Sequence, residues 1–201
     1  MFENIINIII STVFLVFLDK IISYKFNKPY YLLHGLVNFI IVYLVYNDII
    51  ILYTDFDNSY NYLINTKAID ICIALHFYHI ISYNLTYEDW KHHILMFLVE
   101  FNVVYILNYK YLVVSHVIFY LCGLPGGIDY ILLFLVRNNY INKYTEKYYN
   151  HILNIFIRSS GAIISSFIIN IYRQNHFKNI NDYRMNDIYY LYTVNTLYTL
   201  V

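Results

Sequence analysis

The sequence predicts an all-α integral membrane protein, a polytopic bundle of about six transmembrane helices with a range of five to seven. Its composition is 60% hydrophobic and 13% charged, whereas soluble domains have about 45–50% apolar and about 25% charged residues. Aromatic residues make up 20% of the chain, with 26 Tyr and one Trp. Tyrosine suits membrane interfaces, although an AT-rich genome would also enrich it. Five or six segments approach the roughly 20 apolar residues that cross a bilayer.

The predicted spans are apolar runs separated by short polar loops. They cover about 5–24, 31–53, 68–83, 90–107, 111–136 and 151–172. The third is short, and the fifth is interrupted by the run Gly-Leu-Pro-Gly-Gly at 123–127, which indicates either a kink or a tight turn between two short helices. Short loops without linkers or repeats predict one domain over 1–201, folded as an antiparallel bundle.

Charge and cysteine content exclude several classes. The net charge is zero, so the clustered basic face of a nucleic-acid-binding protein is not expected. Cys72 and Cys122 lie in apolar runs without metal-site spacing and are predicted to be buried thiols. The first apolar run lacks the basic start and the small-residue cleavage site of a signal peptide, so we expect a retained helix.

The segment Glu-Asp-Trp-Lys-His-His at 88–93 is the strongest candidate for chemistry. Asp89 precedes His92 and His93 by three and four residues, which places all three on one helical face. Glu100 continues this face into the membrane, where an acid is costly unless it faces the bundle interior. Because a carboxylate beside a histidine supports general base catalysis, we predict these four residues as catalytic. The alternative is a solvated helix cap with histidines at headgroup level.

A polar stripe runs along the predicted sixth span at 100° per residue. It consists of His151, Asn154, Arg158, Ala162 and Ser165. Arg158 must either pair, with Glu100 or Asp129 as candidate partners, or extend to the interface. We predict that Arg158 and Asp129 bind substrate. The small residues at 159–162 suit close helix packing, including homo-oligomerisation through the sixth span.

A metal centre is an alternative that the histidines raise. His76 and His79 are spaced by three and share a helical face. Together with His92 and His93 they would suit a metal-dependent membrane oxidoreductase or hydrolase. Zinc needs three or four ligands within tetrahedral reach, which spacing alone does not show. We therefore predict no metal site and no cofactor.

The segment from Asp89 to Met96 resembles the one that marks TLC-domain membrane proteins. In that family an Asp precedes a His-His pair at the start of a transmembrane helix, and a proline at a helix break follows later, here within 123–127. The resemblance covers about 31–172. It implies a protein of the endoplasmic reticulum or a related membrane that binds, senses or metabolises lipids, with membrane lipids as partners and a lipid or acyl-CoA as ligand. If the protein is an enzyme, the resemblance implies a lipid acyltransferase.

Three positions depart from the ceramide synthases of that family. Met96 stands where they have Thr, His116 lacks the adjacent acid of their His-Asp pair, and Leu121 replaces an acid before the proline motif. Lipid handling without synthase activity therefore fits better, with His116 as a further substrate-binding residue. A non-enzymatic transporter or structural protein, with Glu100 in a charge network, is the remaining alternative.

Overall fold

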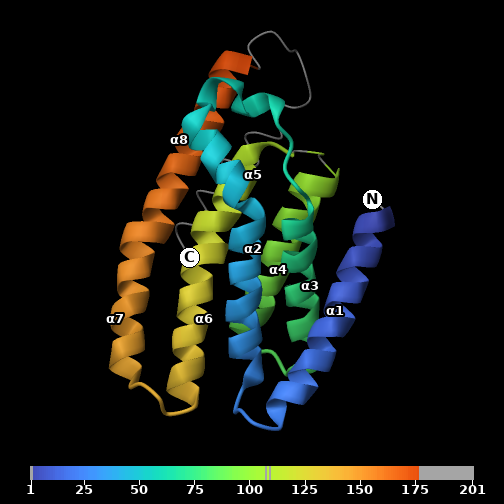
Figure 1. Ribbon diagram of the computed structural model, residues 1–201, viewed down its shortest axis with the longest axis vertical. Helices are drawn as coiled ribbons and strands as arrows, with labels where there is room; N and C mark the ends of the chain where they lie inside the picture. The colour runs from blue at the N-terminus through green and yellow to red at the C-terminus, as the bar shows by residue number, and fades with distance from the viewer. Residues whose placement is uncertain (1, 107, 109, 177–201) are drawn as a thin grey trace.

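The computed structural model describes residues 2–106, 108 and 110–176, and these residues form an up-and-down bundle of helices (Figure 1). The α-helices are α1 (Phe2–Ser23), α2 (Pro29–Thr54), α3 (Lys67–Ser82), α4 (Tyr87–Phe101), α5 (Leu112–Val117), α6 (Leu124–Arg137), α7 (Lys143–Leu153) and α8 (Ser160–His176). A 3-10 helix, η1 (Phe56–Asn61), follows α2, and the π-helical segments are η2 (Asn102–Ile106), η3 (Ile118–Gly123) and η4 (Asn154–Ser159). No β-strand occurs among the described residues, where Leu63 and Tyr111 form an isolated bridge.

Four helices of the described chain are long and apolar enough to cross a membrane, namely Phe2–Ser23, Pro29–Thr54, Leu112–Arg137 and Lys143–Tyr172. The all-α prediction is confirmed, and these helices are consistent with a membrane protein. Six spans are not confirmed: α3 has 16 residues, short of the roughly 20 that a perpendicular crossing needs, and α4 with its continuation η2 is not among the four. The predicted third and fourth spans are nevertheless helices that pack against each other.

The proline at position 125 does not interrupt the fifth predicted span. The helix runs continuously from Leu112 to Arg137, with the π-helical η3 directly before Pro125 in the first turn of α6. A proline inside a helix removes one backbone hydrogen bond, and the change of hydrogen-bond pattern in η3 directly before Pro125 accommodates that loss. The segment is therefore a continuous helix with a local π-bulge rather than a re-entrant turn.

Glycines bring α6 close to α2. A Cβ at Gly126 would lie 2.8 Å from Nδ2 of Asn38, and one at Gly127 would lie 2.9 Å from the ring of Phe39. Larger residues would push the two helices apart. The Gly-Gly pair thus fixes the distance between α2 and α6, which form one side of the cavity described below.

Tyrosines donate hydrogen bonds to the acids that α1 and α3 bring into the bundle. Asp19 accepts hydrogen bonds from Tyr78 (2.7 Å) and Tyr83 (2.6 Å), and Asp70 accepts one from Tyr105. Because an unpaired carboxylate inside a membrane bundle is costly, these contacts make both acids compatible with burial. The hydrogen bond from Tyr78 to Asp19 also joins α3 to α1.

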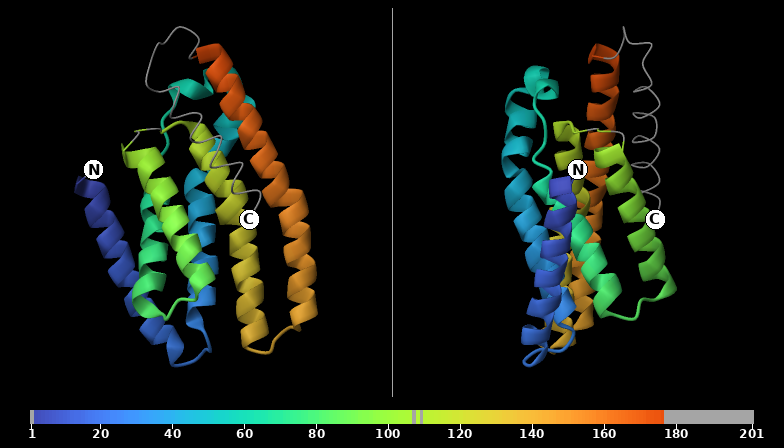
Figure 2. Two further views of the ribbon diagram at one scale, coloured as in Figure 1. Left: turned by 180° about the vertical axis from the view of Figure 1, so that it is seen from behind. Right: turned by 90° about the vertical axis from the view of Figure 1, so that its right-hand side faces the viewer.

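Helix α4 lies at one side of the bundle and packs on α3 (Figure 2). The α1–α2, α3–α4 and α6–α7 loops lie at the same end of the bundle. There the backbone of Asn27 and the side chain of Asn138 exchange two hydrogen bonds, of 3.1 and 3.2 Å. These contacts join the α1–α2 loop to the α6–α7 loop.

Candidate ligand cavity

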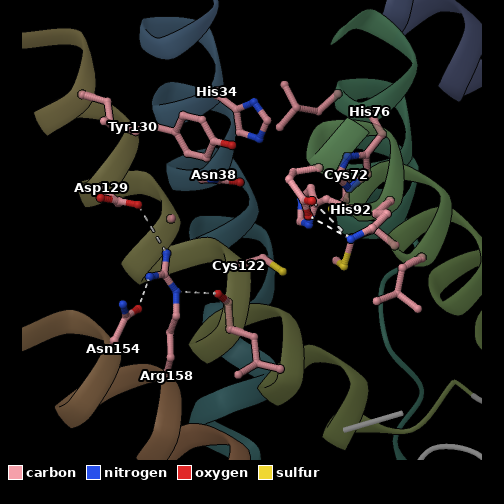
Figure 3. A pocket seen from close by; sticks show the side chains of 18 of the residues that line it. His34, Asn38, Cys72, His76, His92, Cys122, Asp129, Tyr130, Asn154 and Arg158 are labelled. Atoms are coloured by element: carbon pink, nitrogen blue, oxygen red, sulfur yellow. Dashed lines mark hydrogen bonds and ion pairs between the residues drawn. The ribbon is translucent and has the colours of Figure 1, made fainter. Parts of the chain in front are cut away.

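A cavity of about 670 Å³ lies between α3 and α4 on one side and α2, α6 and η4 on the other. Polar side chains from five elements line it, including His34, Asn38, His76, His92, Asp129, Tyr130, Asn154 and Arg158. Figure 3 shows Asp129, Asn154 and Arg158 on one side of the cavity and His76 and His92 on the other. Its volume falls within the range of about 300–1,000 Å³ that is usual for small-molecule sites.

The mouth of the cavity lies between α4 and η4. The lining residues from α2 and α3 are buried, whereas His92 and Leu95 on α4 and Asn154 and Ser159 on η4 are exposed. Leu75, Met96, Leu121 and Leu133 supply apolar lining. The cavity therefore combines a polar interior with apolar walls and opens at the side of the bundle.

Four histidines, His76, His79, His92 and His93, cluster on the first side of the cavity, and His76 and His92 line it. Nδ1 of His93 lies 2.7 Å from Nδ1 of His76. Nε2 of His93 lies 2.8 Å from Nδ1 of His79. The ring of His92 packs edge-on against that of His76, with centroids 5.5 Å apart. A neutral imidazole donates from one nitrogen and accepts at the other, so His93 relays one line of hydrogen bonds. Whichever histidine donates in these two hydrogen bonds, Nε2 of His76 is buried without a partner among the described residues.

Stacked rings extend this cluster to α6. Tyr30 stacks on His79 at 4.5 Å between centroids, and His34 stacks on Tyr130 at 3.9 Å. His34 is 4% exposed, and its Nδ1 has no partner among the described residues. The spacing of His34 and Asn38 by four residues on a buried face of α2 is a sequence signal that our prediction did not use.

Arg158 and Asp129 form the second wall. The guanidinium of Arg158 lies 3.8 Å from the Asp129 carboxylate and donates to Asn154 and to the Leu121 carbonyl oxygen, the latter at 3.3 Å. Asp129 is thus confirmed as a partner of Arg158. Oδ1 of Asp129 is buried without a partner. The wall therefore offers a cation together with an unused carboxylate acceptor.

Unsatisfied polar atoms concentrate around the cavity. Among the described residues, four buried side-chain nitrogen or oxygen atoms lack a hydrogen-bond partner, and those of His34, His76 and Asp129 belong to cavity-lining residues. Each such atom costs a fold about 1–3 kcal/mol. Because buried polar groups are normally paired, three orphans around one cavity indicate a polar ligand or bound water.

Comparison of the chain with protein-family models, with curated proteins and with solved structures found no match. The interpretation of the cavity therefore rests on its own residues.

Asp89 lies beside the histidines in sequence but serves as a helix cap. Its carboxylate accepts hydrogen bonds from the Thr86 backbone N–H (3.0 Å) and hydroxyl (2.7 Å), while the Asp89 N–H donates back to that hydroxyl (3.2 Å). Partial burial raises the pKa of Asp89, but the bonds from Thr86 outweigh it and hold that pKa below its ordinary value. The hydrogen-bond partners of His93 are the other histidines rather than this acid.

The remaining predicted residues lie elsewhere. The side chain of Glu100 falls outside the described part of the chain. His116 is fully buried between α2 and α8, where its Nε2 contacts Tyr53 (2.8 Å) and its Nδ1 contacts Ser165 (2.7 Å). Because the Ser165 hydroxyl donates to the Gly161 carbonyl oxygen (2.8 Å), Nδ1 of His116 must carry the proton. His116 does not line the cavity, and both of its nitrogens are satisfied.

The small residues of the predicted sixth span pack within the chain in part. Gly161 and Ala162 are buried, and a Cβ at Gly161 would lie 2.2 Å from Cβ of Tyr120. Ser159 and Ser160 are exposed. The close packing predicted for this stretch is thus used between α8 and η3, and the two serines remain available to a partner.

Proposed function

We propose that this protein is a multi-pass membrane protein that binds a single-chain or double-chain lipid, with the lipid head group in the cavity and its tail at the mouth. The three unpaired polar atoms of His34, His76 and Asp129 around the cavity are the observation that carries the proposal. A head group that both donates and accepts hydrogen bonds, such as an amide or hydroxyl head, would satisfy them.

The position of the mouth supports a lipid rather than a soluble metabolite. It lies between α4 and η4, where Leu95 and Met96 of α4 line the cavity. A tail leaving through this gap would meet the hydrocarbon region, while the head stays beside Arg158. Lys91 and Glu88, paired at 3.2 Å, are exposed at the start of α4 and also line the cavity.

The resemblance of Asp89, His92 and His93 to the TLC pattern points to the same class of ligand. We propose lipid binding or sensing in a membrane of the endoplasmic reticulum type. Acyl transfer is the second candidate, because His92 faces the cavity and a neutral imidazole could accept a proton from a lipid amine or hydroxyl. The Asp89 carboxylate would then fix the start of α4, and thereby the position of His92, without contacting the base directly.

Native mass spectrometry of the purified chain tests lipid binding. We expect one lipid per chain that survives detergent exchange, and its loss in Arg158→Gln and in the double variant His92→Ala, His93→Ala. Arg137→Gln is the matched control, because Arg137 is exposed at the end of α6 and outside the cavity lining. Lipid that exchanges freely, or equal retention by Arg158→Gln and Arg137→Gln, would contradict the proposal.

A further inference from the structure

Three of the clustered histidines are close enough together to share one metal ion. His76, His92 and His93 each offer one ring nitrogen, and the three nitrogens lie within 4.8 Å of one another. They come from α3 and α4, which are joined by a short loop and pack directly together. Two rigid helices therefore hold the three donors in place.

We propose that His76, His92 and His93 bind one divalent transition-metal ion of the Zn²⁺ type. Imidazole suits Zn²⁺, Cu²⁺, Ni²⁺ and Fe²⁺, whereas Mg²⁺ and Ca²⁺ require oxygen ligands. Nitrogens bound to one tetrahedral Zn²⁺ lie roughly 3.3 Å apart, given Zn–N distances of about 2.0–2.1 Å. The 2.7 Å contact between His76 and His93 must open by about 0.6 Å, and separations up to 4.8 Å must close by about 1.5 Å, within reach of ring rotations.

The two ring nitrogens of His76 fit the two roles of a metal-bound histidine. His76 is 4% exposed, and its Nε2 has no partner among the described residues although it belongs to a cavity-lining side chain. Nδ1 of His76 lies 2.7 Å from Nδ1 of His93, so a metal between these two rings would be bound through Nδ1 of His76. Coordination through one ring nitrogen also lets the other act as a donor toward the cavity.

The surroundings of His93 match the support that metal-bound histidines usually have. A ligating imidazole commonly uses its second nitrogen as a donor to a neighbouring acceptor, which fixes the tautomer. Nε2 of His93 lies 2.8 Å from Nδ1 of His79, and Tyr30 stacks on the His79 ring. His93 would then bind the metal through Nδ1, the atom that faces His76.

Three protein ligands leave a fourth position open to a water or a ligand group. His76 and His92 line the cavity, so this position faces the space opposite Arg158. Open sites of this kind are the catalytic rather than the structural type of zinc site. The metal site does not depend on the proposed lipid, because its ligands are all side chains of the protein.

Titration of Zn²⁺ into the full chain tests the site. The chain is purified in detergent without a histidine tag, stripped with a chelator and titrated against a chromophoric competitor. We expect one Zn²⁺ per chain, at least tenfold weaker binding in His92→Ala, His76→Ala and His93→Ala, and an intermediate loss in His79→Phe. His151→Ala is the matched control, because His151 is exposed on α7 and should keep the parent affinity.

His92 is exposed, so its substitution leaves the fold intact and decides the test even where the buried variants fail to fold. Co²⁺ in place of Zn²⁺ should give the intense visible absorption of a four-coordinate site, and His92→Ala should abolish it. Less than half a metal ion per chain, or equal affinity in His92→Ala and His151→Ala, would overturn the proposal. Arg158→Gln should lose lipid but keep metal, which separates failure of the metal site from failure of the lipid site.

Discussion

Two regions of the bundle bury histidines, and they differ in whether the polar atoms are satisfied. At His116, both ring nitrogens are hydrogen-bonded, and the Ser165 hydroxyl donates its own hydrogen bond to the Gly161 carbonyl oxygen. Around the cavity, His34 and His76 each keep a nitrogen without a partner among the described residues.

His116 stabilises the fold through both of its ring nitrogens. His34 and His76 each stabilise it less, because one buried nitrogen of each ring has no hydrogen-bond partner among the described residues. A satisfied buried network rigidifies its surroundings, whereas unpaired buried groups subtract from stability. Proteins retain such unpaired groups at sites where a ligand completes them. The prediction that His116 binds substrate is therefore not supported by its position, and His34 takes its place as a cavity residue.

The largest effect on stability is expected from His116→Ala. Removal of a fully buried ring leaves a void and ends two hydrogen bonds, at a cost of about 3 kcal/mol. Thermal unfolding in detergent should show a clear fall in Tm, while Zn²⁺ affinity and bound lipid stay as in the parent. Loss of ligand at an unchanged Tm would reverse the roles of the two regions.

Gly161→Ala tests the packing beside His116. The new methyl group would overlap Cβ of Tyr120, so α8 must move away from η3 at a cost of about 2 kcal/mol. Ser160→Ala is the control, since Ser160 is exposed and adjacent. Equal Tm values for the two variants would show that α8 and η3 are not in close contact.

His34→Phe is expected to raise the stability of the fold, in contrast to the two variants above. Phenylalanine keeps the stack on Tyr130 and removes the unpaired nitrogen, so the fold should gain about 1 kcal/mol. The same variant should retain less lipid, because a hydrogen-bonding group is lost from the cavity. A destabilised His34→Phe with unchanged lipid would indicate that His34 is paired and structural.

The smallest effect is expected from Asp89→Asn, at about 0.5 kcal/mol, because the cap is exposed to solvent. The Thr86 hydrogen bonds hold the folded-state pKa of Asp89 below its value in the unfolded chain, about 3.9. Its stabilisation is thus full above that pKa and is lost as the pH falls through the lower folded-state pKa. In unfolding measurements the variant should differ most from the parent at pH 7, the difference should shrink as the pH falls below about 3.9, and Glu88→Gln should show less.

Much of the fold follows from the sequence, and less of the site does. The apolar runs predict the helices, and the need to pair Arg158 inside a bundle predicts Glu100 or Asp129 as its partner, of which Asp129 lies beside it. Helical spacing also places His76 beside His79 and His92 near His93. It does not show that α3 and α4 pack face to face, so the three-histidine group could not be predicted. Local spacing suggested Asp89 as the partner of these histidines, but Thr86 competes for its carboxylate at shorter range.

An experimental structure of the chain in lipid nanodiscs tests the central claim most directly. We predict elongated density in the cavity, with a head group in contact with Arg158 and Asp129 and a tail leaving between Leu95 of α4 and η4. The nitrogen of His34 should then be paired. A cavity filled by water alone, or closed by α4 moving against α6, would contradict the account.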